Sequence, residues 1–378
     1  MQFSRFPKKR IRRSAAVITG TLIGAAGLLA ASGALAASAS ASPRTFIGNL
    51  HHVKVVASTI PGNGDVNPYG VAVVPHSTGH LYRGDVLVSN FNDKTNTQGT
   101  GTTIVQVSPH GKVSLFAGIK DSKCPGGVGL TTALVALRSG WVIVGSLPTQ
   151  NGGTLSGPGC LIVLDQWGNV RKTITGYGID GPWDMTALDG GHVAVLFVTN
   201  VLGGILGNHP NPNGGTVQRL VITSNPYQTP RVLSSTKIGS GFPAKTDPNA
   251  LVLGPTGVGL SWNGTLYVAS TVDSRITAIP NAVYRHHSDG TGYTVSEGGH
   301  LNAPLGLAIA PNGHILTVNG GDGNIVETSP GGRQVAYKTI DNNMGGAGDL
   351  FGLAVKPGAD AVYFVDDFSA NNNLQLFF

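Results

Sequence analysis

A unit of about 50 residues that recurs along the chain limits the possible folds more than any other feature. Between Asn67 and Phe378 there are 312 residues, which six copies share at 52 residues each. Each copy opens with a Gly/Pro-rich segment and continues as four short apolar stretches separated by Pro, Gly, Asn and Asp turns. Glycine and proline supply the positive or fixed φ that turns between strands require. A repeat of this length with four strands per copy predicts a β-propeller.

The composition agrees with a strand-rich fold. Charged residues make up 12% of the 378 residues, whereas 56 residues are Gly and 22 are Pro. A coiled coil, a helical bundle or a charge-rich disordered chain needs charged or helix-forming residues that are scarce here. Gly and Pro follow no strict period, which excludes collagen.

The two ends of the repeat region predict how the ring closes. The last copy, which ends at Phe378, is one strand short, and an unassigned apolar strand at His52–Ser58 precedes the first copy. An open ring would expose two sheet edges, which closure removes. We therefore predict an all-β fold: one six-bladed β-propeller of four-stranded blades in residues 42–378, closed by a strand at residues 52–60 that completes the last blade. The predicted blades span residues 67–118, 126–176, 180–239, 254–299, 302–341 and 348–378. Two packed β-sandwiches are the competing architecture, but they do not explain the repeat.

The N-terminal segment has the pattern of a secretory signal peptide. A basic head, Arg5–Arg13, precedes a Leu/Ala/Gly-rich apolar stretch and three Ala-x-Ala sites that end at Ala41. This order is typical of a cleaved signal, which we assign to residues 1–41. An uncleaved membrane anchor is the alternative, because the apolar stretch is about long enough to span a bilayer. The signal predicts a secreted or periplasmic protein with no membrane insertion after cleavage.

Charge and cysteine content bound the possible partners. Of 25 basic residues, six lie in the signal peptide, so the mature chain carries 19 basic and 19 acidic residues. A nucleic-acid partner would require a basic surface, and none is predicted. The two cysteines, Cys124 and Cys160, are expected to pair as a disulfide in an exported protein, although two separate buried thiols are the alternative. We expect a monomer.

The repeat resembles a known family. Blade starts such as Asn67-Pro68-Tyr69-Gly70-Val71-Ala72 and Asn302-Ala303-Pro304-Leu305-Gly306-Leu307, followed by Pro-x-Gly turns, resemble NHL repeats. The wider group includes gluconolactonase/regucalcin-type hydrolases, streptogramin lyases, strictosidine-synthase-like proteins and peptide-amidating lyases. The resemblance covers most of residues 50–378 and implies a propeller fold. It specifies no activity, because this fold carries many functions.

The resemblance implies where ligands bind. In such propellers the ligand lies at a mouth of the central channel, among the loops that lead into each blade and follow each second strand. Applied to this sequence, it indicates Tyr69, Trp183, Asp184, Asn90, Asn200, Asp273, Asn319, Asp322, Asp366 and Asp367. A ring of Asn and Asp oxygens suits Ca²⁺ or Mg²⁺, with Asp184, Asn200, Asn319 and Asp366 as the candidate ligands. The competing interpretation is that Asn and Asp cap turns through their own backbone.

The catalytic sets of the family are not reproduced. The first blade start, Asn67–Gly70, lacks the acidic residue of the gluconolactonase-like hydrolases. The chain has only two Glu, Glu297 and Glu327, and neither has a fixed spacing to a His. No Gly-x-Ser-x-Gly or His-Glu-x-x-His motif is present, so the catalytic residues stay unknown.

Three insertions follow second strands, at residues 91–102, 148–159 and 201–215. All three are expected to rise over the same face of the ring, and long loops on a rigid scaffold commonly carry binding functions. Two hypotheses follow. The first is an exported binding module that uses this loop-covered face for a small molecule, a glycan or a protein. The second is a metal-assisted hydrolase or lyase, lactonase-like, at the mouth of the channel.

Overall fold

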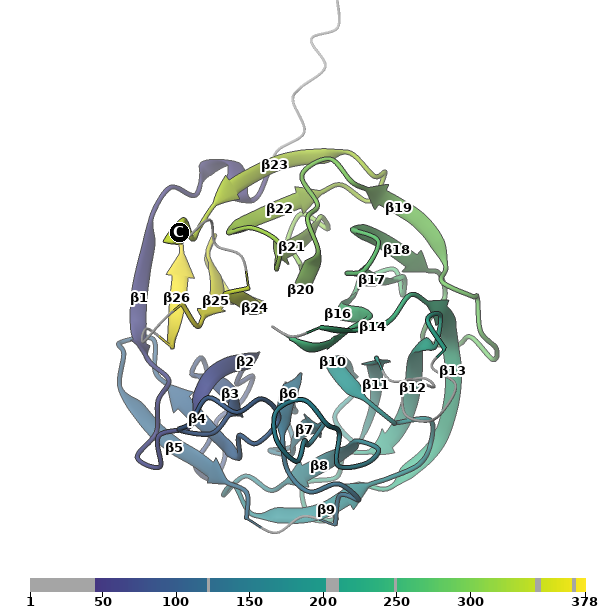
Figure 1. Ribbon diagram of the computed structural model, residues 1–378. Coiled ribbons are helices and arrows are strands. Elements are labelled where there is room, and N and C mark those ends of the chain that lie inside the picture. Colours follow the sequence, from purple (N-terminus) through teal and green to yellow (C-terminus); the bar gives the residue numbers. More distant parts are fainter. Residues whose placement is uncertain (1–44, 121–122, 202–210, 248–249, 344–347, 369–371) are drawn as a thin grey trace, which may run out of the picture. The chain divides into compact units, whose positions relative to one another are not determined.

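The computed structural model describes residues 45–378 apart from residues 121–122, 202–210, 248–249, 344–347 and 369–371 (grey in Figure 1). The predicted signal peptide and most of the third insertion therefore lie outside the described residues. Among the described residues, one 3₁₀ helix, η1 (Ile47–Asn49), accompanies the strands. In the same part of the chain, no helix is long and apolar enough to cross a membrane.

Six four-stranded antiparallel sheets form the six blades of a β-propeller, as predicted (Figure 1). The first three blades are β2 (Val66–Val73), β3 (Val86–Asn92), β4 (Thr103–Val107) and β5 (Val113–Gly118); β6 (Leu130–Ala136), β7 (Val142–Ser146), β8 (Cys160–Leu164) and β9 (Val170–Ile174); and β10 (Pro182–Asp189), β11 (Val193–Asn200), β12 (Gly215–Thr223) and β13 (Val232–Phe242). The fourth and fifth are β16 (Pro255–Leu260), β17 (Leu266–Ser270), β18 (Arg275–Ile279) and β19 (Tyr293–Glu297); and β20 (Pro304–Ile309), β21 (Ile315–Asn319), β22 (Asn324–Thr328) and β23 (Gln334–Thr339). The sixth holds β24 (Leu350–Val355), β25 (Val362–Asp366), β26 (Asn373–Phe377) and β1 (Val53–Ser58).

The ring closes through β1, which confirms the predicted N-terminal strand. β1 pairs antiparallel with β26, from Val53 opposite Phe377 to Ser58 opposite Asn373. The segment before β1 is also fixed, because the backbone N–H groups of Phe46 and Ile47 donate to the buried Glu327 carboxylate at 2.8 Å. The closure is thus held both by a strand ladder in the sixth blade and by a side chain of the fifth.

The core lies between neighbouring blades. The middle strands β3, β4, β7 and β8 are buried along their whole length, which suits their continuous apolar runs. The outer strands, such as β5 and β19, are largely exposed. The apolar residues therefore serve mainly to pack one blade against the next.

The innermost strands approach each other closely around the axis. Each of β2, β6, β10, β16, β20 and β24 contacts the next, and β24 contacts β2. A Cβ added at Gly306 would lie 2.1 Å from the Phe351 carbonyl oxygen, and one at Gly352 would lie 2.2 Å from that of Tyr69. The glycine of the repeat is therefore required by the packing of one inner strand against the next.

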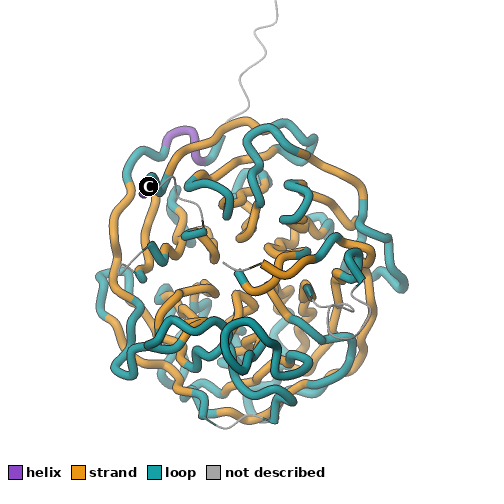
Figure 2. The backbone as a smooth tube through the Cα atoms, in the orientation of Figure 1, coloured by secondary structure: helices purple, strands orange, loops and turns teal. Residues whose placement is uncertain are grey.

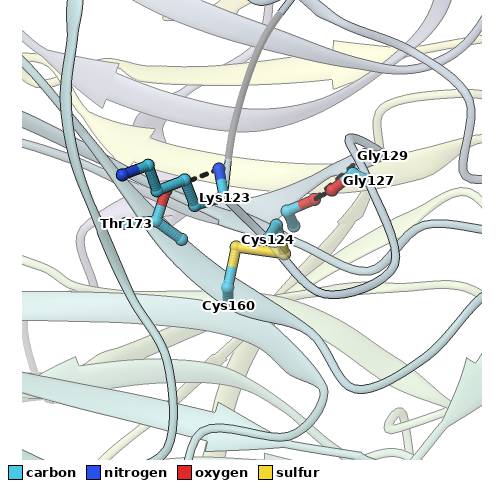
Figure 3. Close-up of a disulfide and its surroundings, with 7 residues drawn as sticks. Lys123, Cys124, Gly127, Gly129, Cys160 and Thr173 are labelled. Atoms are coloured by element: carbon cyan, nitrogen blue, oxygen red, sulfur yellow. Dashed lines mark hydrogen bonds between the residues drawn. A yellow bond between two sulfur atoms is a disulfide. The ribbon is translucent and has the colours of Figure 1, made fainter.

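A disulfide joins Cys124 to Cys160, with Cα atoms 5.6 Å apart and 36 residues of separation (Figure 3). This confirms the predicted pairing. Cys124 precedes β6 and Cys160 opens β8, so the bond fixes the loop that leads into the second blade to the end of the insertion at 148–159. In the same close-up, the Lys123 backbone N–H donates to the Thr173 hydroxyl at 3.2 Å.

One element has no counterpart in the repeat. The hairpin β14 (Lys245–Asp247) and β15 (Leu251–Leu253) lies between the third and fourth blades in sequence. Figures 1 and 2 show it reaching over the centre of the ring. The repeat does not predict this hairpin, because residues 245–253 belong to none of the six copies.

Candidate functional site

Equivalent positions in the six blades follow from the strand register. Near the start of each inner strand, one residue pairs with a residue at or near the end of the second strand. The pairs are Pro68–Asn90, Leu130–Ser146, Pro182–Asn200, Pro255–Ser270, Pro304–Asn319 and Leu350–Asp366. These pairs mark one face of the ring, the loop face, which also carries the insertions. The opposite face, the turn face, carries the turns between first and second strands.

On the loop face, the channel is closed by aromatic side chains. The ring centroid of Tyr69 lies 4.1 Å from that of Phe351, 4.5 Å from that of Phe91 and 5.9 Å from that of Trp183. The Trp183 indole N–H donates to the Val252 carbonyl of the β14–β15 hairpin at 3.3 Å. Each of these four rings is at most 3% exposed. The structure therefore brings the predicted site residues Tyr69 and Trp183 together as a packed plug.

Below the plug, the channel continues as a cavity of about 550 Å³ that reaches the turn face. All six inner strands contribute residues to its walls. Most of these residues have apolar side chains, but the surface that faces the cavity is more polar than apolar. The wall residues nearest the plug include Val71, Leu134, Asp184, Val258, Leu307 and Leu353, and those toward the turn face include Val73, Leu137, Leu188, Leu260, Ala308 and Ile309.

Asp184 is the carboxylate at the inner end of this cavity. One of its oxygens accepts a hydrogen bond from the Met185 backbone N–H at 2.8 Å, and the other accepts from the Val258 backbone N–H at 3.1 Å. Burial raises the pKa of Asp184 from 3.8 to about 7, although the two backbone donors oppose the shift. Within the described part of the chain, no basic side chain forms an ion pair with it.

The predicted strand-end residues belong to different blades, and each binds the loops of its own blade. Asn90 donates to the Thr59 carbonyl at 3.1 Å, and Asn319 donates to the His300 carbonyl at 2.8 Å. Asn200 accepts from the backbone N–H of Asp180 at 3.2 Å. In each case the partner belongs to the segment that leads into the same blade. These amides therefore act as structural ties at equivalent positions.

The remaining predicted residues have local partners. Asp273 forms an ion pair with Arg275 at 3.0 Å, and Asp322 accepts from the Asn324 backbone N–H and the Asn319 amide, both at 3.0 Å. Asp366 accepts from the Gln375 amide at 2.6 Å and from the Phe368 backbone N–H at 2.9 Å.

An acidic cluster on the loop face includes Asp366 and Asp367. Burial and the neighbouring charges of Asp349, Asp366 and Asp341 raise the pKa of Asp367 to about 8. Burial, together with Asp341 and Asp366, raises the pKa of Asp349 to about 6. Sequence reasoning missed Asp341 and Asp349, since both fall outside the strand-end positions it considered.

Among the described residues, the structure shows no Ca²⁺ or Mg²⁺ site at the predicted ligands. Hard cations take six or more oxygen ligands that converge on one point, whereas Asp184, Asn200, Asn319 and Asp366 are bound to separate structural partners. Among the described residues, no group of three or more His, Cys, Asp or Glu side chains is arranged to hold a metal ion. We therefore derive no step through a metal at these residues.

The described parts of the first two insertions lie against each other on the loop face. The Thr149 backbone N–H donates to the Gly99 carbonyl at 3.0 Å, and the Thr149 hydroxyl donates to the Gln98 carbonyl. Residues 152–153 and the hairpin residues Thr246, Asp247 and Leu251 line a shallow pocket of about 200 Å³. These insertions thus form an ordered layer beside the hairpin.

Comparison with known proteins supports the fold. No protein-family model and no curated protein matches the sequence. A gluconolactonase from Xanthomonas campestris is 11% identical, with a TM-score of 0.54 over 88% of this chain and 90% of the other. The calcium-binding protein regucalcin from Agrobacterium tumefaciens is 12% identical, with a TM-score of 0.53 over 85% and 92%. Virginiamycin B lyase from Staphylococcus aureus is 13% identical, with a TM-score of 0.50 over 86% and 88%. The predicted resemblance is thereby confirmed for the six-bladed fold.

Proposed function

We propose that this protein binds an elongated small molecule in its central channel, which the ligand enters from the turn face. The observation that carries this proposal is the cavity of about 550 Å³ surrounded by the six inner strands. Its size lies within the range of small-molecule sites, roughly 300–1,000 Å³. Here the plug of Tyr69, Trp183 and Phe351 provides a closed end.

The loop face is a second candidate for binding, directed at a glycan or a protein. The hydrogen bonds between Thr149 and the backbone of residues 98–99 support this role, because an ordered surface loses less conformational entropy on binding. It differs from the channel in that a partner would contact polar loops rather than the inner strands.

A hydrolase or lyase is the enzymatic alternative, suggested by the names of the similar structures. The feature in its favour is Asp184, since a carboxyl group whose pKa is near 7 can transfer protons at neutral pH. Turnover of a lactone or ester that is lost in Asp184→Ala would establish this alternative over simple binding.

Export is part of the proposal. The Cys124–Cys160 disulfide supports it, because disulfides persist mainly in oxidising compartments. Intact-mass measurement of the protein recovered from the natural host tests it: loss of residues 1–41 is the expected result, and a retained N-terminus contradicts it.

Fluorescence of the neutral apolar probe N-phenyl-1-naphthylamine tests the channel. We expect saturable enhancement that is lost in Thr186→Phe, because a phenyl ring at this partly buried wall position would narrow the cavity. The matched control is Ser234→Phe on the exposed outer strand β13, which adds the same group elsewhere. Equal binding by both variants would contradict the proposal.

A further inference from the structure

Asp184 departs from the pattern of the repeat. Two positions after the inner-strand residue of each register pair stands Gly70, Thr132, Asp184, Gly257, Gly306 or Gly352. In four blades this position is glycine, because the adjacent inner strand leaves no space for a side chain. In the third blade the position carries a carboxylate instead, and its oxygens are held by backbone donors of β10 and of the neighbouring β16.

The two backbone donors fix the orientation of this carboxylate. Met185 N–H and Val258 N–H each bind a different oxygen, so the group cannot rotate freely. Each carboxylate oxygen can accept two hydrogen bonds, and one acceptor position per oxygen therefore stays open. The carboxylate is thus prepared for a donor that arrives through the channel.

The charge of Asp184 has no protein counterion in the described residues. The other ionisable residues along the cavity are Arg138 and Asp189, and the Arg138 backbone N–H donates to the Asp189 carboxylate at 2.7 Å. Asp189 follows Asp184 by five residues in β10, which separates them by about 17 Å in an extended strand. Arg138 and Asp189 therefore mark the mouth of the cavity, and Asp184 marks its inner end.

We propose that the channel ligand is an aliphatic amine whose ammonium group pairs with the Asp184 carboxylate and whose hydrocarbon chain extends along the channel toward the turn face. This inference rests on the proposed function. A cation offsets the desolvation of the carboxylate, which a neutral or anionic group does not. Leu188, Leu260 and Ile309, which line the cavity, provide apolar contacts for the chain.

Calorimetric titration of the intact protein with n-octylammonium chloride, 1-octanol and sodium octanoate tests this assignment. At pH 8 we expect octylammonium to bind at least tenfold more tightly than octanol, and octanoate to bind most weakly. Asp184→Asn should weaken octylammonium at least tenfold and change octanol by less than threefold, because a charge-assisted hydrogen bond is worth about 1.5–3 kcal/mol. Asp360→Asn, at an exposed position outside the cavity lining, is the matched control and should leave both affinities within about twofold.

The wild-type protein supplies a readout that does not depend on any variant. The ligand stays an ammonium ion between pH 5.5 and 8, while Asp184, with its pKa raised to about 7, becomes ionised. Octylammonium affinity should therefore rise by about tenfold over this interval, whereas octanol affinity should not. Arg138 and Asp189 are the only other ionisable residues described along the cavity. The same two residues are present when either ligand binds.

The outcomes separate this inference from the proposed function. Equal affinities for octylammonium and octanol would overturn the amine assignment and leave an apolar channel site. A preference for octanoate, or undiminished octylammonium binding in Asp184→Asn, would also overturn it. Binding of none of the three compounds would overturn both the amine assignment and the channel.

Discussion

Asp184 is the single residue on which both the structural and the functional conclusions depend. It occupies a position where four blades have glycine, and two backbone N–H groups bind its carboxylate inside the channel. A residue that breaks a structural pattern at an energetic cost is a common mark of a functional site. The cost itself can be measured.

The stability cost of Asp184 depends on pH. In the unfolded chain the carboxyl group loses its proton near pH 4, whereas in the folded protein it keeps the proton until about pH 7. The stability it contributes is therefore complete below pH 4 and is lost as the pH rises through about 7. Relative to Asp184→Asn, the wild type should lose about 3 kcal/mol of unfolding free energy between pH 4.5 and pH 8. Urea denaturation at both pH values measures this; a constant difference between the two proteins would contradict it.

Glu327 is the residue that fixes the N-terminal segment. It accepts hydrogen bonds from the backbone of Phe46 and Ile47, contacts His314 Nδ1 at 2.6 Å, and is fully buried. Glu327→Ala leaves these donors without their acceptor, and we expect a loss of about 2–4 kcal/mol in unfolding free energy. Glu297→Ala, at an exposed position of β19, is the control and should change stability by less than about 0.5 kcal/mol. Similar losses of unfolding free energy in both variants would contradict this role of Glu327.

The elements show why the fold was easier to predict than the site. The copies of the repeat predict the six blades, and the missing strand of the last copy predicts the closure by β1, because both follow from strand pairing. The β14–β15 hairpin could not be predicted in this way, since residues 245–253 match no copy. Because this hairpin was not predicted, the closed end of the channel was not predicted either.

The roles of Asn90, Asn200 and Asn319 could not be decided from the sequence. Their position after second strands suits ligands and structural ties equally well, and only the partners distinguish the two. The structure shows hydrogen bonds to the segments that lead into the same blades. The glycine pattern of the inner strands was, in contrast, visible in the sequence, and the exception at Asp184 was the signal that could have identified the channel site.

The structural roles of the strand-end residues Asn90, Asn200 and Asn319 predict how the protein responds to divalent ions. These residues already bind partners within the fold, and a ligand stabilises a protein only by binding its native state. We therefore expect 5 mM Ca²⁺, 5 mM Mg²⁺ or a chelator to shift the melting temperature by no more than about 1 °C. Thermal unfolding with and without each addition measures this. A rise of several degrees with Ca²⁺ would restore the metal-assisted hydrolase or lyase as the better hypothesis.

The whole molecule should be less stable in alkaline than in mildly acidic solution. Burial raises the pKa of Asp349 to about 6, of Asp184 to about 7 and of Asp367 to about 8. Each raised pKa means that stability is lost as the pH rises through the folded value. Calorimetry should show a melting temperature several degrees lower at pH 9 than at pH 5. A higher melting temperature at pH 9 would contradict these carboxyl environments.

We propose that the whole molecule is a ring that is closed on its loop face and binds a ligand from its turn face. A crystal structure of the protein grown with n-octylammonium chloride would show the ligand itself. We expect the amine nitrogen within hydrogen-bonding distance of the Asp184 carboxylate, with the alkyl chain among Leu188, Leu260 and Ile309 and the Tyr69–Trp183–Phe351 plug intact. A channel filled by side chains, or a ligand held only among the loops beside the β14–β15 hairpin, would contradict it.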